Sequence, residues 1–597
     1  MSSDKKKSKR TLSDIFLIKR LSKYLLTHKK LMLIALAMII TQTIFFALGP
    51  YLVMKILDNY VIQDKEIEFL GIWILYLAVT FLRYIPMYIL LWVLLVAGEK
   101  TMYTLRKDTY EKLQDNSMDY FDKTPAGDSL ARMTSDIDSI QPILSGEVLM
   151  ALSSIFMVIG GLVVCLTISL TLTLVTLSLF PVIIIFALFQ RQFVRKKWDA
   201  YREFNSKYIA SMAENISGAR VSQSFARSEF NRADFDEINE EFYQKGISAF
   251  RWSSLLNPFY ETYAKVTIIL VLLIGGTLTL KNPDDLSVGS LVLFILYLNQ
   301  FVDPLMILTG LYALIQTSFS AFERIITLID TPSSITEAVD AKPLACHSGK
   351  IELNKVTFSY ESGETRVLED FSLSIQPNEC IAIVGETGSG KTSIISLISR
   401  LYDIQEGSIR IDGQDIRDVT LSSLRKYVGV VVQEPFLFSE SVRYNLCYGK
   451  DASDEEIKEV LTLISAEFAY DLSDGLDTKV GERGGWLSLG QRQLISFARA
   501  LITNPKIILL DEATSSIDPQ AELRIQRALS KMLEDRTSII VAHRLSTVRA
   551  ADRIIVLHAG KIIEEGTFDE LLAQKGEFYE LYKLQFRHEG LKKYENK

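Results

Sequence analysis

A glycine-rich run in the carboxyl-terminal half carries the clearest chemical signal in the sequence. Residues 385–392 read GETGSGKT and match the pattern GxxxxGK[ST]. An apolar, strand-like run (380–384) precedes the pattern and a helical segment (393–401) follows it, which is the context that a phosphate-binding loop requires. Glycines let backbone N–H groups approach phosphates, and the following helix directs its positive end toward them.

This loop predicts a nucleotide site. Lys391 would hold the β- and γ-phosphates, and the hydroxyl of Thr392 would ligate a magnesium ion. The residues expected to bind the nucleotide here are Gly385, Glu386, Thr387, Gly388, Ser389, Gly390, Lys391, Thr392 and Ser393.

Two adjacent acidic residues follow a second apolar run, 507–510. Asp511 stands at the end of the expected strand, where a carboxylate facing the phosphates can hold magnesium. Glu512 cannot point the same way, because successive side chains of a strand alternate, and it is suited to polarising the attacking water. The alternative is a solvated strand end, which the presence of the phosphate loop makes the weaker interpretation.

The elements that carry these residues belong to a chain of two unlike halves. Its 597 residues exceed the length of one domain, which is about 100–200 residues. The hydrophobic share is 48% despite 23% charged residues, and the mean hydropathy is +0.18. Long apolar runs fill residues 31–322, whereas residues 340–597 have the composition of a soluble α/β domain.

The apolar runs predict six membrane-spanning helices, since one span needs about 20 apolar residues. Arg83 is the only charge in the second run, and a turn near Ser169 would divide an uncharged stretch of 43 residues into two spans. Pro304, which follows Asp303, should kink the sixth span. The spans are expected at 31–54, at 69–98, twice within 148–190, around 266–280, and at 286–302 with a continuation to about residue 322.

Basic residues predict the orientation of these spans. The segment 99–138 holds six Lys and Arg residues and the segment 191–251 holds eleven, while the short opposite connections carry Lys65 and Lys281. The positive-inside rule then places both long segments, and both termini, in the cytosol. No cleavable signal peptide is apparent before residue 31.

Helical periodicity extends beyond the spans. Residues 99–114 and 198–214 alternate apolar and charged residues at helical intervals, so the spans should continue as helices into the cytosol. Residues 15–26 form a basic amphipathic stretch that fits a helix on the inner membrane surface, a solvated or core helix being the alternative.

Charged residues within spans are costly and therefore informative. Arg83 and Asp303 stand within spans, and Glu261 and Lys265 stand four residues apart on one helical face, where they could pair. These groups either line a substrate cavity or fix helix packing, and the sequence does not decide between the two.

Composition excludes some other classes of function. The net charge is −7, with nothing that resembles a basic groove, so a nucleic-acid partner is not expected. The four cysteines and five histidines have no metal-ligand spacing.

Further motifs reveal a resemblance to a known family. Residues 487–491 (LSLGQ) resemble the LSGGQ signature of ATP-binding cassette (ABC) proteins, and residues 478–484 (TKVGERG) resemble the segment that precedes this signature in exporters. The resemblance implies that the cofactors are ATP and Mg²⁺ and that Ser488, Gly490 and Gln491 contact nucleotide. It also implies adenine stacking by Tyr360, a magnesium contact by Gln433, a dimer contact at residues 515–518, and a γ-phosphate contact by His543, which would act with Glu512 in catalysis.

The membrane half resembles the type IV ABC exporters. Residues 118–136 and 217–229 look like their two coupling segments, which rest on the cassettes, the second usually on the partner's. The expected fold is an α-helical six-span transmembrane domain fused to an α/β nucleotide-binding domain. Its expected parts are a basic cytosolic amino terminus (1–30), the transmembrane domain (31–325), a linker (326–349), the cassette (350–585) and a charged tail (586–597).

The same resemblance implies a dimer. In this family ATP is held between the phosphate loop of one cassette and the signature of another, so one chain would need a second half-transporter. Leu489 stands where the signature has its first glycine, while Glu512 is retained. That combination favours a heterodimer with one degenerate site over a homodimer, although many family members vary at this position.

Export of a lipophilic substrate, drug-like or lipid, is the function expected from this architecture. An ATP-gated channel and a non-transport ABC ATPase are the alternatives, and six spans fused to a cassette argue against a soluble ATPase. We expect an integral membrane protein in a prokaryotic plasma membrane, with the lipid bilayer as a further partner.

Overall fold

The computed structural model describes residues 12–58, 69–281, 286–299, 302–360, 366–511, 519–542 and 545–583. The chain divides into two compact units. The first contains residues 1–113 and 127–330, and the second contains residues 114–126 and 331–597. Residues 114–126 therefore group with the carboxyl-terminal unit although they lie far from it in sequence.

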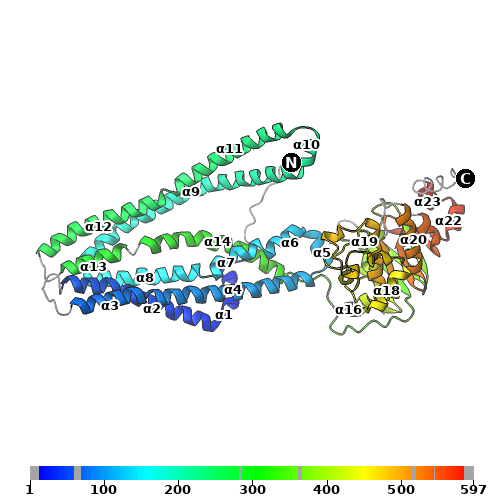
Figure 1. The fold of residues 1–597 in the computed structure, drawn as a ribbon, viewed down its shortest axis with the longest axis horizontal. Helices are drawn as coiled ribbons and strands as arrows, with labels where there is room; N and C mark the ends of the chain where they lie inside the picture. Colours follow the sequence, from blue (N-terminus) through cyan, green and yellow to red (C-terminus); the bar gives the residue numbers. More distant parts are fainter. Residues whose placement is uncertain are drawn as a thin grey trace. The chain divides into compact units, whose positions relative to one another are not determined.

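The first unit is built from helices (Figure 1). Several of them contain long apolar stretches, as burial in a bilayer requires. The helices up to residue 330, including α5 of the second unit, are α1 (Asp14–Leu26), α2 (Lys29–Ile56), α3 (Phe69–Leu82), α4 (Tyr84–Asp115), α5 (Met118–Lys123), α6 (Ala126–Met133), α7 (Ser135–Leu144), α8 (Glu147–Ile168), α9 (Leu170–Ser217), α10 (Ala219–Ser224), α11 (Ser228–Ser253), α12 (Leu256–Lys281), α13 (Val288–Asn299) and α14 (Val302–Asp330).

Apolar helices occupy all six expected span positions, but not all of them reach spanning length. Among the described residues, four stretches are long and apolar enough to cross a membrane. The fourth and sixth expected spans contain shorter apolar stretches, Leu170–Val182 and Val288–Leu298. A transmembrane domain is confirmed, and among the described residues four of the six expected spans reach membrane-spanning length. The four long stretches lie within Lys29–Ile56, Leu70–Asp115, Met150–Ile168 and Ser228–Lys281.

The interruptions between helices agree with local sequence chemistry. Ser169 adopts an extended conformation between α8 and α9, and its hydroxyl caps α9 by accepting a hydrogen bond from the backbone N–H of Leu172. The expected turn at this residue is confirmed. α13 ends at Asn299 and α14 begins at Val302, and residues 300 and 301 and the side chain of Asp303 lie outside the described residues, so the predicted kink stays a prediction.

The two long basic segments are helical, as expected. Figure 1 shows α9 beside α11, with the short α10 joining them at one end. Aromatic rings hold this pair together, because Phe242 of α11 stacks on Tyr201 and Tyr208 of α9 at centroid distances of 5.0 and 4.9 Å. We call α9, α10 and α11 the helical arm.

The amino-terminal amphipathic stretch forms α1. Leu17 and Leu21 are buried in a core with helices of the same unit, and Arg20 pairs with Asp330 at 2.9 Å. Ile15 and Ile18 are exposed on the same helix. A helix with one buried and one exposed apolar face fits the expected position at a membrane surface.

The charges predicted within spans have different environments. The guanidinium of Arg83 is half-buried and donates a hydrogen bond to the Tyr84 hydroxyl at 3.3 Å. Glu261 and Lys265 are both exposed and do not pair with each other, so the ion pair considered from their spacing is not formed.

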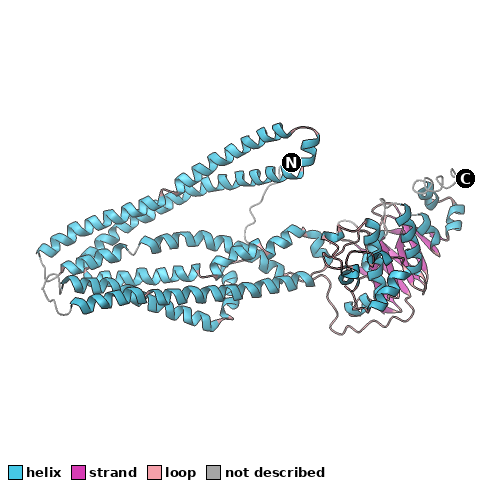
Figure 2. Ribbon diagram, in the orientation of Figure 1, coloured by secondary structure: helices cyan, strands magenta, loops and turns pink. Residues whose placement is uncertain are grey.

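The second unit contains two β-sheets (Figure 2). The larger sheet has the order β10-β9-β3-β8-β7-β6, in which all neighbours except β10 and β9 are parallel. The smaller sheet is antiparallel, with the order β2-β1-β4-β5. The strands are β1 (Ile351–Phe358), β2 (Leu368–Ile375), β3 (Cys380–Gly385), β4 (Glu406–Ile411), β5 (Gln414–Asp415), β6 (Val428–Val431), β7 (Ile507–Asp511), β8 (Thr537–Val541), β9 (Arg553–His558) and β10 (Lys561–Gly566).

Apolar side chains cover both faces of the larger sheet, which explains why its strands are continuous apolar runs. Ile381 and Ile383 of β3 point into the core shared with the smaller sheet, whereas Ala382 and Val384 point into the core formed with helices. The helices of this unit after residue 330 are α15 (Lys391–Ile398), α16 (Leu421–Tyr427), α17 (Val442–Leu446), α18 (Asp454–Leu463), α19 (Leu489–Ile502), α20 (Pro519–Leu533), α21 (Leu545–Ala550), α22 (Phe568–Gln574) and α23 (Glu577–Leu581).

Candidate nucleotide site

Four parallel strands bring the predicted site segments to one edge of the larger sheet. β3, β8, β7 and β6 are neighbours and run parallel, so their carboxyl ends lie at the same edge. The phosphate loop follows β3, Asp511 ends β7, and Gln433 lies two residues after β6. Ligands of open α/β sheets bind at the carboxyl ends of the strands, where the phosphate loop of this sheet lies.

The phosphate loop depends on its glycines. Gly385, Gly388 and Gly390 have φ angles of +153°, +86° and +102°, which side chains rarely adopt. A Cβ atom at Gly385 would lie 2.2 Å from the carbonyl oxygen of Leu557, whereas a Cβ at Gly388 would meet open space. The loop backbone therefore packs against β9 at Gly385 and faces open space at Gly388.

Lys391 is the first residue of α15 and is only 6% exposed. Its ammonium donates hydrogen bonds to the carbonyl oxygens of Gly385 and Glu386, at 2.9 and 2.7 Å. Burial lowers the pKa of Lys391, and the negative charge of Asp511 acts in the opposite direction. Lys391 and Asp511, the predicted metal ligand, therefore lie close enough for their charges to interact.

The loop also contains an unsatisfied polar group. The hydroxyl of Ser389 is buried and forms no hydrogen bond with any described residue. Such a group normally carries a free-energy penalty of about 1–3 kcal/mol. A phosphate oxygen would satisfy it, so Ser389 and Lys391 together fit a bound phosphate.

The predicted magnesium ligands are all oxygen donors. Asp511 is half-buried, whereas Thr392 and Gln433 are exposed. A hydroxyl, an amide and a carboxylate suit a hard cation that retains water and phosphate ligands. Within the described residues there is no cluster of three or more His, Cys, Asp or Glu side chains able to hold a metal by itself.

Tyr360 follows β1 of the smaller sheet and contacts the phosphate-loop helix. Its hydroxyl lies 2.9 Å from the Ser393 hydroxyl, so the two predicted site residues are hydrogen-bonded. The ring is 37% exposed and is held edge-on by two others, Phe358 at 4.9 Å and Tyr402 at 5.1 Å between centroids. An exposed ring on rigid neighbours is available to a flat ligand such as adenine.

The signature segment forms the start of a helix. Ser488 is the N-cap of α19, and its hydroxyl accepts from the Gln491 backbone N–H at 3.2 Å while the Gln491 side chain accepts from the Ser488 N–H at 2.9 Å. Leu489 is the first residue of the helix and is half-buried. In the described part of the chain, no hydrogen bond joins Ser488 or Gln491 to the phosphate loop.

Glu512, His543 and the segment 515–518 lie outside the described residues. Glu512 directly follows Asp511, the last residue of β7, and His543 lies two residues after β8. In the sequence, both residues therefore follow strands that end at the same edge of the sheet.

Sequence reasoning missed Tyr402, which contacts the Tyr360 ring. Tyr402 lies beyond the end of α15, and its packing against a residue that follows β1 depends on how the two sheets meet. A local pattern of residue types carries no signal for such a contact.

Comparisons with known proteins agree with this geometry. Residues 32–305 match the family model "ABC transporter transmembrane region", and residues 368–515 match "ABC transporter". The chain is 38% identical over 82% of its length to the uncharacterized ABC transporter ATP-binding protein YknV of Bacillus subtilis, covering 81% of that protein. It is 36% identical to the ATP-dependent lipid A-core flippase of Syntrophus aciditrophicus, with 82% of each chain covered.

A solved structure extends the similarity to the fold. A bacterial Atm1-family ABC exporter with ATP bound has a TM-score of 0.77 at 25% identity, covering 94% of this chain and 98% of the other.

Proposed function

The chain belongs to the ABC transporter family, as an exporter with its membrane and ATPase units fused, and we propose that it is one half of a dimer that exports a lipophilic substrate. It binds ATP and couples ATP hydrolysis to transport as an integral membrane protein. The observation that carries the proposal is the buried Lys391 beside the unsatisfied Ser389, in a chain that also holds an apolar helical unit.

The proposed catalytic roles follow from the chemistry of each residue. Lys391 and the loop N–H groups neutralise charge on the phosphates, and Tyr360 stacks on adenine. Thr392, Gln433 and Asp511 would hold Mg²⁺, which supplies further charge neutralisation when bound. Glu512 accepts hydrogen bonds from the attacking water, and His543 holds the γ-phosphate and Glu512 in register.

A second half-transporter completes the proposed site. Ser488, Gly490 and Gln491 would contact the nucleotide of the other cassette. This fits the finding that, among the described residues, no hydrogen bond joins Ser488 or Gln491 to this chain's own phosphate loop. Apolar side chains at the tip of the helical arm also support a dimer. These side chains are between 62% and 75% exposed in Ile216, Val221 and Phe225. Exposed apolar side chains on a cytosolic helix are suited to a protein interface, and a partner's cassette would cover them.

We favour a heterodimer over a homodimer. The preference depends on Leu489, which replaces a glycine at the signature, together with a retained Glu512. In that arrangement the hydrolytic site combines Lys391 and Glu512 of this chain with the partner's signature. The chain composition of the active particle distinguishes the two arrangements.

Alternating access would couple the ATPase to transport. ATP can shift the protein toward a state with closed cassettes only if it binds that state more tightly than the open one. Closure would turn the substrate cavity outward, and hydrolysis would reset it. The basic segments 99–138 and 191–251 favour a cytosolic position of the cassettes by the positive-inside rule, which fits a prokaryotic plasma membrane.

Transport by the purified protein in proteoliposomes tests the proposal. With cassettes facing outward, ATP should move a head-group-labelled phospholipid into the luminal leaflet, and Glu512→Gln should abolish this movement. A lipid is chosen because a relative is named a lipid A-core flippase. An ATP-dependent ion conductance without lipid movement would favour the channel alternative, and hydrolysis without either would favour a non-transport ATPase.

A further inference from the structure

A groove of about 720 Å³ is lined by one face of α1 and by the first residue of α2. On α1 its residues recur at intervals of three or four positions, which places them on the same side of the helix. Basic and apolar side chains alternate there, and no acidic side chain is among the described residues of the lining. We call this feature the α1 groove. Its lining includes Phe16, Lys19, Arg20, Lys23, Leu26 and Lys29.

The opposite face of α1 holds the helix in place. Leu17 and Leu21 are buried in a core of the first unit. The Tyr24 hydroxyl donates a hydrogen bond to the carboxylate of Asp108 on α4, at 2.9 Å. These contacts fix the orientation of α1, so the groove is formed before any ligand binds and a ligand would not have to order it.

The positive charges of the α1 groove are largely unbalanced. Among the described residues, the ammonium groups of Lys19, Lys23 and Lys29 form no ion pair and no hydrogen bond. Arg20 donates from Nη2 to Asp330 at 2.9 Å, but its Nε has no hydrogen-bond partner in the described part of the chain. The groove therefore combines an excess of positive charge with unused donors.

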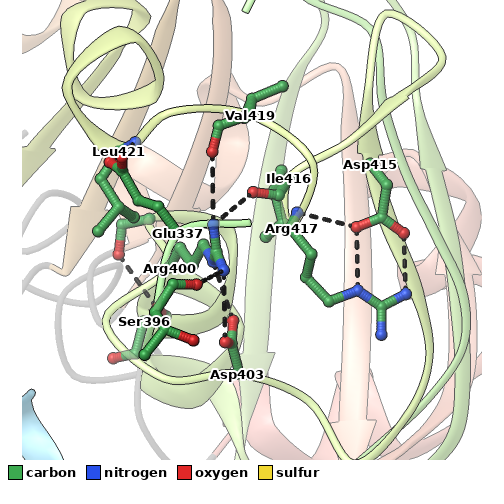
Figure 3. A network of polar contacts seen from close by, with 11 residues as sticks. Glu337, Ser396, Arg400, Asp403, Asp415, Ile416, Arg417, Val419 and Leu421 are labelled. Atoms are coloured by element: carbon green, nitrogen blue, oxygen red, sulfur yellow. Dashed lines mark hydrogen bonds and ion pairs between the residues drawn. The ribbon is translucent and has the colours of Figure 1, made fainter. Parts of the chain in front are cut away.

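Two arginines of the second unit show the opposite arrangement. Figure 3 shows Arg400 and Arg417, each beside a carboxylate. Arg400 donates to Asp403 at 3.0 Å and to the Thr336 carbonyl at 3.1 Å, and Arg417 donates to Asp415 at 2.8 and 3.0 Å. Their charge is balanced within the chain. The lysines of the α1 groove lack such acceptors and remain available to an external anion.

The position of the groove in the chain indicates which anion this is. Lys29 and Lys30 directly precede the uncharged apolar run at residues 31–54, which lies in a helix long enough to cross a membrane. Basic residues at the end of a span lie at the level of the lipid head groups. Phe16 and Leu26 are 41% and 53% exposed and give the groove an apolar part. A ligand there meets both positive charge and apolar surface.

We propose that the α1 groove binds the head group of an anionic phospholipid. The phosphodiester would accept hydrogen bonds from Lys19, Arg20 and Lys23, and the acyl chains would contact Phe16 and Leu26. A zwitterionic lipid carries the same phosphate together with its own cation, so it should bind more weakly. The proposal is independent of which substrate the protein exports.

Native mass spectrometry of the full-length protein tests the groove. The protein in detergent is titrated with dioleoyl phosphatidylglycerol and, in parallel, with dioleoyl phosphatidylcholine. The native chain should bind one phosphatidylglycerol more tightly than any phosphatidylcholine. Lys19→Gln/Lys23→Gln should raise the Kd of that phosphatidylglycerol by about thirtyfold, the ratio expected for two lysines near an anionic lipid. Equal affinity for the two lipids in the native chain would overturn the proposal.

Lys196→Gln/Lys197→Gln is the matched control. Both lysines are exposed on α9 beyond its apolar stretch Leu170–Val182, so the variant loses the same charge near a span but outside the groove. Its Kd for phosphatidylglycerol should stay within about twofold of the native value. Equal weakening in both double variants would show that general surface charge attracts the lipid, and would overturn the groove.

Two further measurements separate a lipid site from a site for any phosphate. Phe16→Ala keeps every cation of the groove and should still weaken phosphatidylglycerol binding by about fivefold, because it removes apolar contact. Inorganic phosphate should not displace the bound lipid, since it gains nothing from the apolar part. Displacement by inorganic phosphate together with native affinity in Phe16→Ala would overturn the lipid assignment. Retained binding of a fluorescent ATP analogue shows that each variant is folded.

Discussion

Glu512→Gln should lower the rate of ATP hydrolysis by about 10²–10⁴, the range that removal of a general base produces. The amide has nearly the shape of the carboxylate but cannot take a proton from water. ATP binding should remain, because the phosphate contacts of Lys391 and the loop are unchanged. Phosphate release at saturating ATP and binding of a fluorescent ATP analogue measure the two quantities.

Glu459→Gln is the matched control, since Glu459 is exposed on α18 and has no proposed contact with nucleotide. It should hydrolyse ATP at the native rate. Hydrolysis by Glu512→Gln at more than about a tenth of the native rate would contradict the assigned role, since loss of a general base lowers the rate by at least about 10².

Lys391→Ala should weaken ATP binding and slow ATP hydrolysis together. The ammonium is buried at the start of α15, where its two carbonyl partners can be exchanged for phosphate oxygens. Its loss removes a charge-assisted donor from both the bound and transition states, so hydrolysis should fall by about 10²–10³ and the Kd for ATP should rise. Binding titration and steady-state hydrolysis measure both effects.

Lys458→Ala, on the exposed face of α18, controls for the loss of a lysine in the same unit. The contrast with Glu512→Gln is informative, because only the lysine variant should lose ATP affinity. Native affinity in Lys391→Ala would show that this loop does not hold the phosphates.

Local patterns predicted those parts of the site that one strand and its following loop define. The phosphate loop, the strand ending in Asp511 and the turn at Ser169 all depend on neighbouring residues, and the structure confirms their local form. The order of the strands in the sheet could not be predicted from local patterns. That β8 lies between β3 and β7, bringing the three strand ends to one edge, depends on long-range pairing.

Contacts between distant side chains were the least predictable features. The four-residue spacing of Glu261 and Lys265 permitted an ion pair, yet these two exposed side chains do not form one. Conversely, nothing in the local sequence of Asp122 or Arg400 indicates that they hold α5 and the 331–337 segment at one turn. Such contacts follow from tertiary packing, which residue spacing along one helix does not encode.

The central claim is that hydrolysis requires two half-transporters. Native mass measurement of each chromatographic fraction, paired with its ATPase rate per chain, tests it most directly. We predict that a particle containing this chain alone as a monomer binds ATP without turnover, and that turnover appears only in particles of two half-transporters, the second being a different chain. A monomer that hydrolyses ATP as fast per chain as the paired particle would contradict the account.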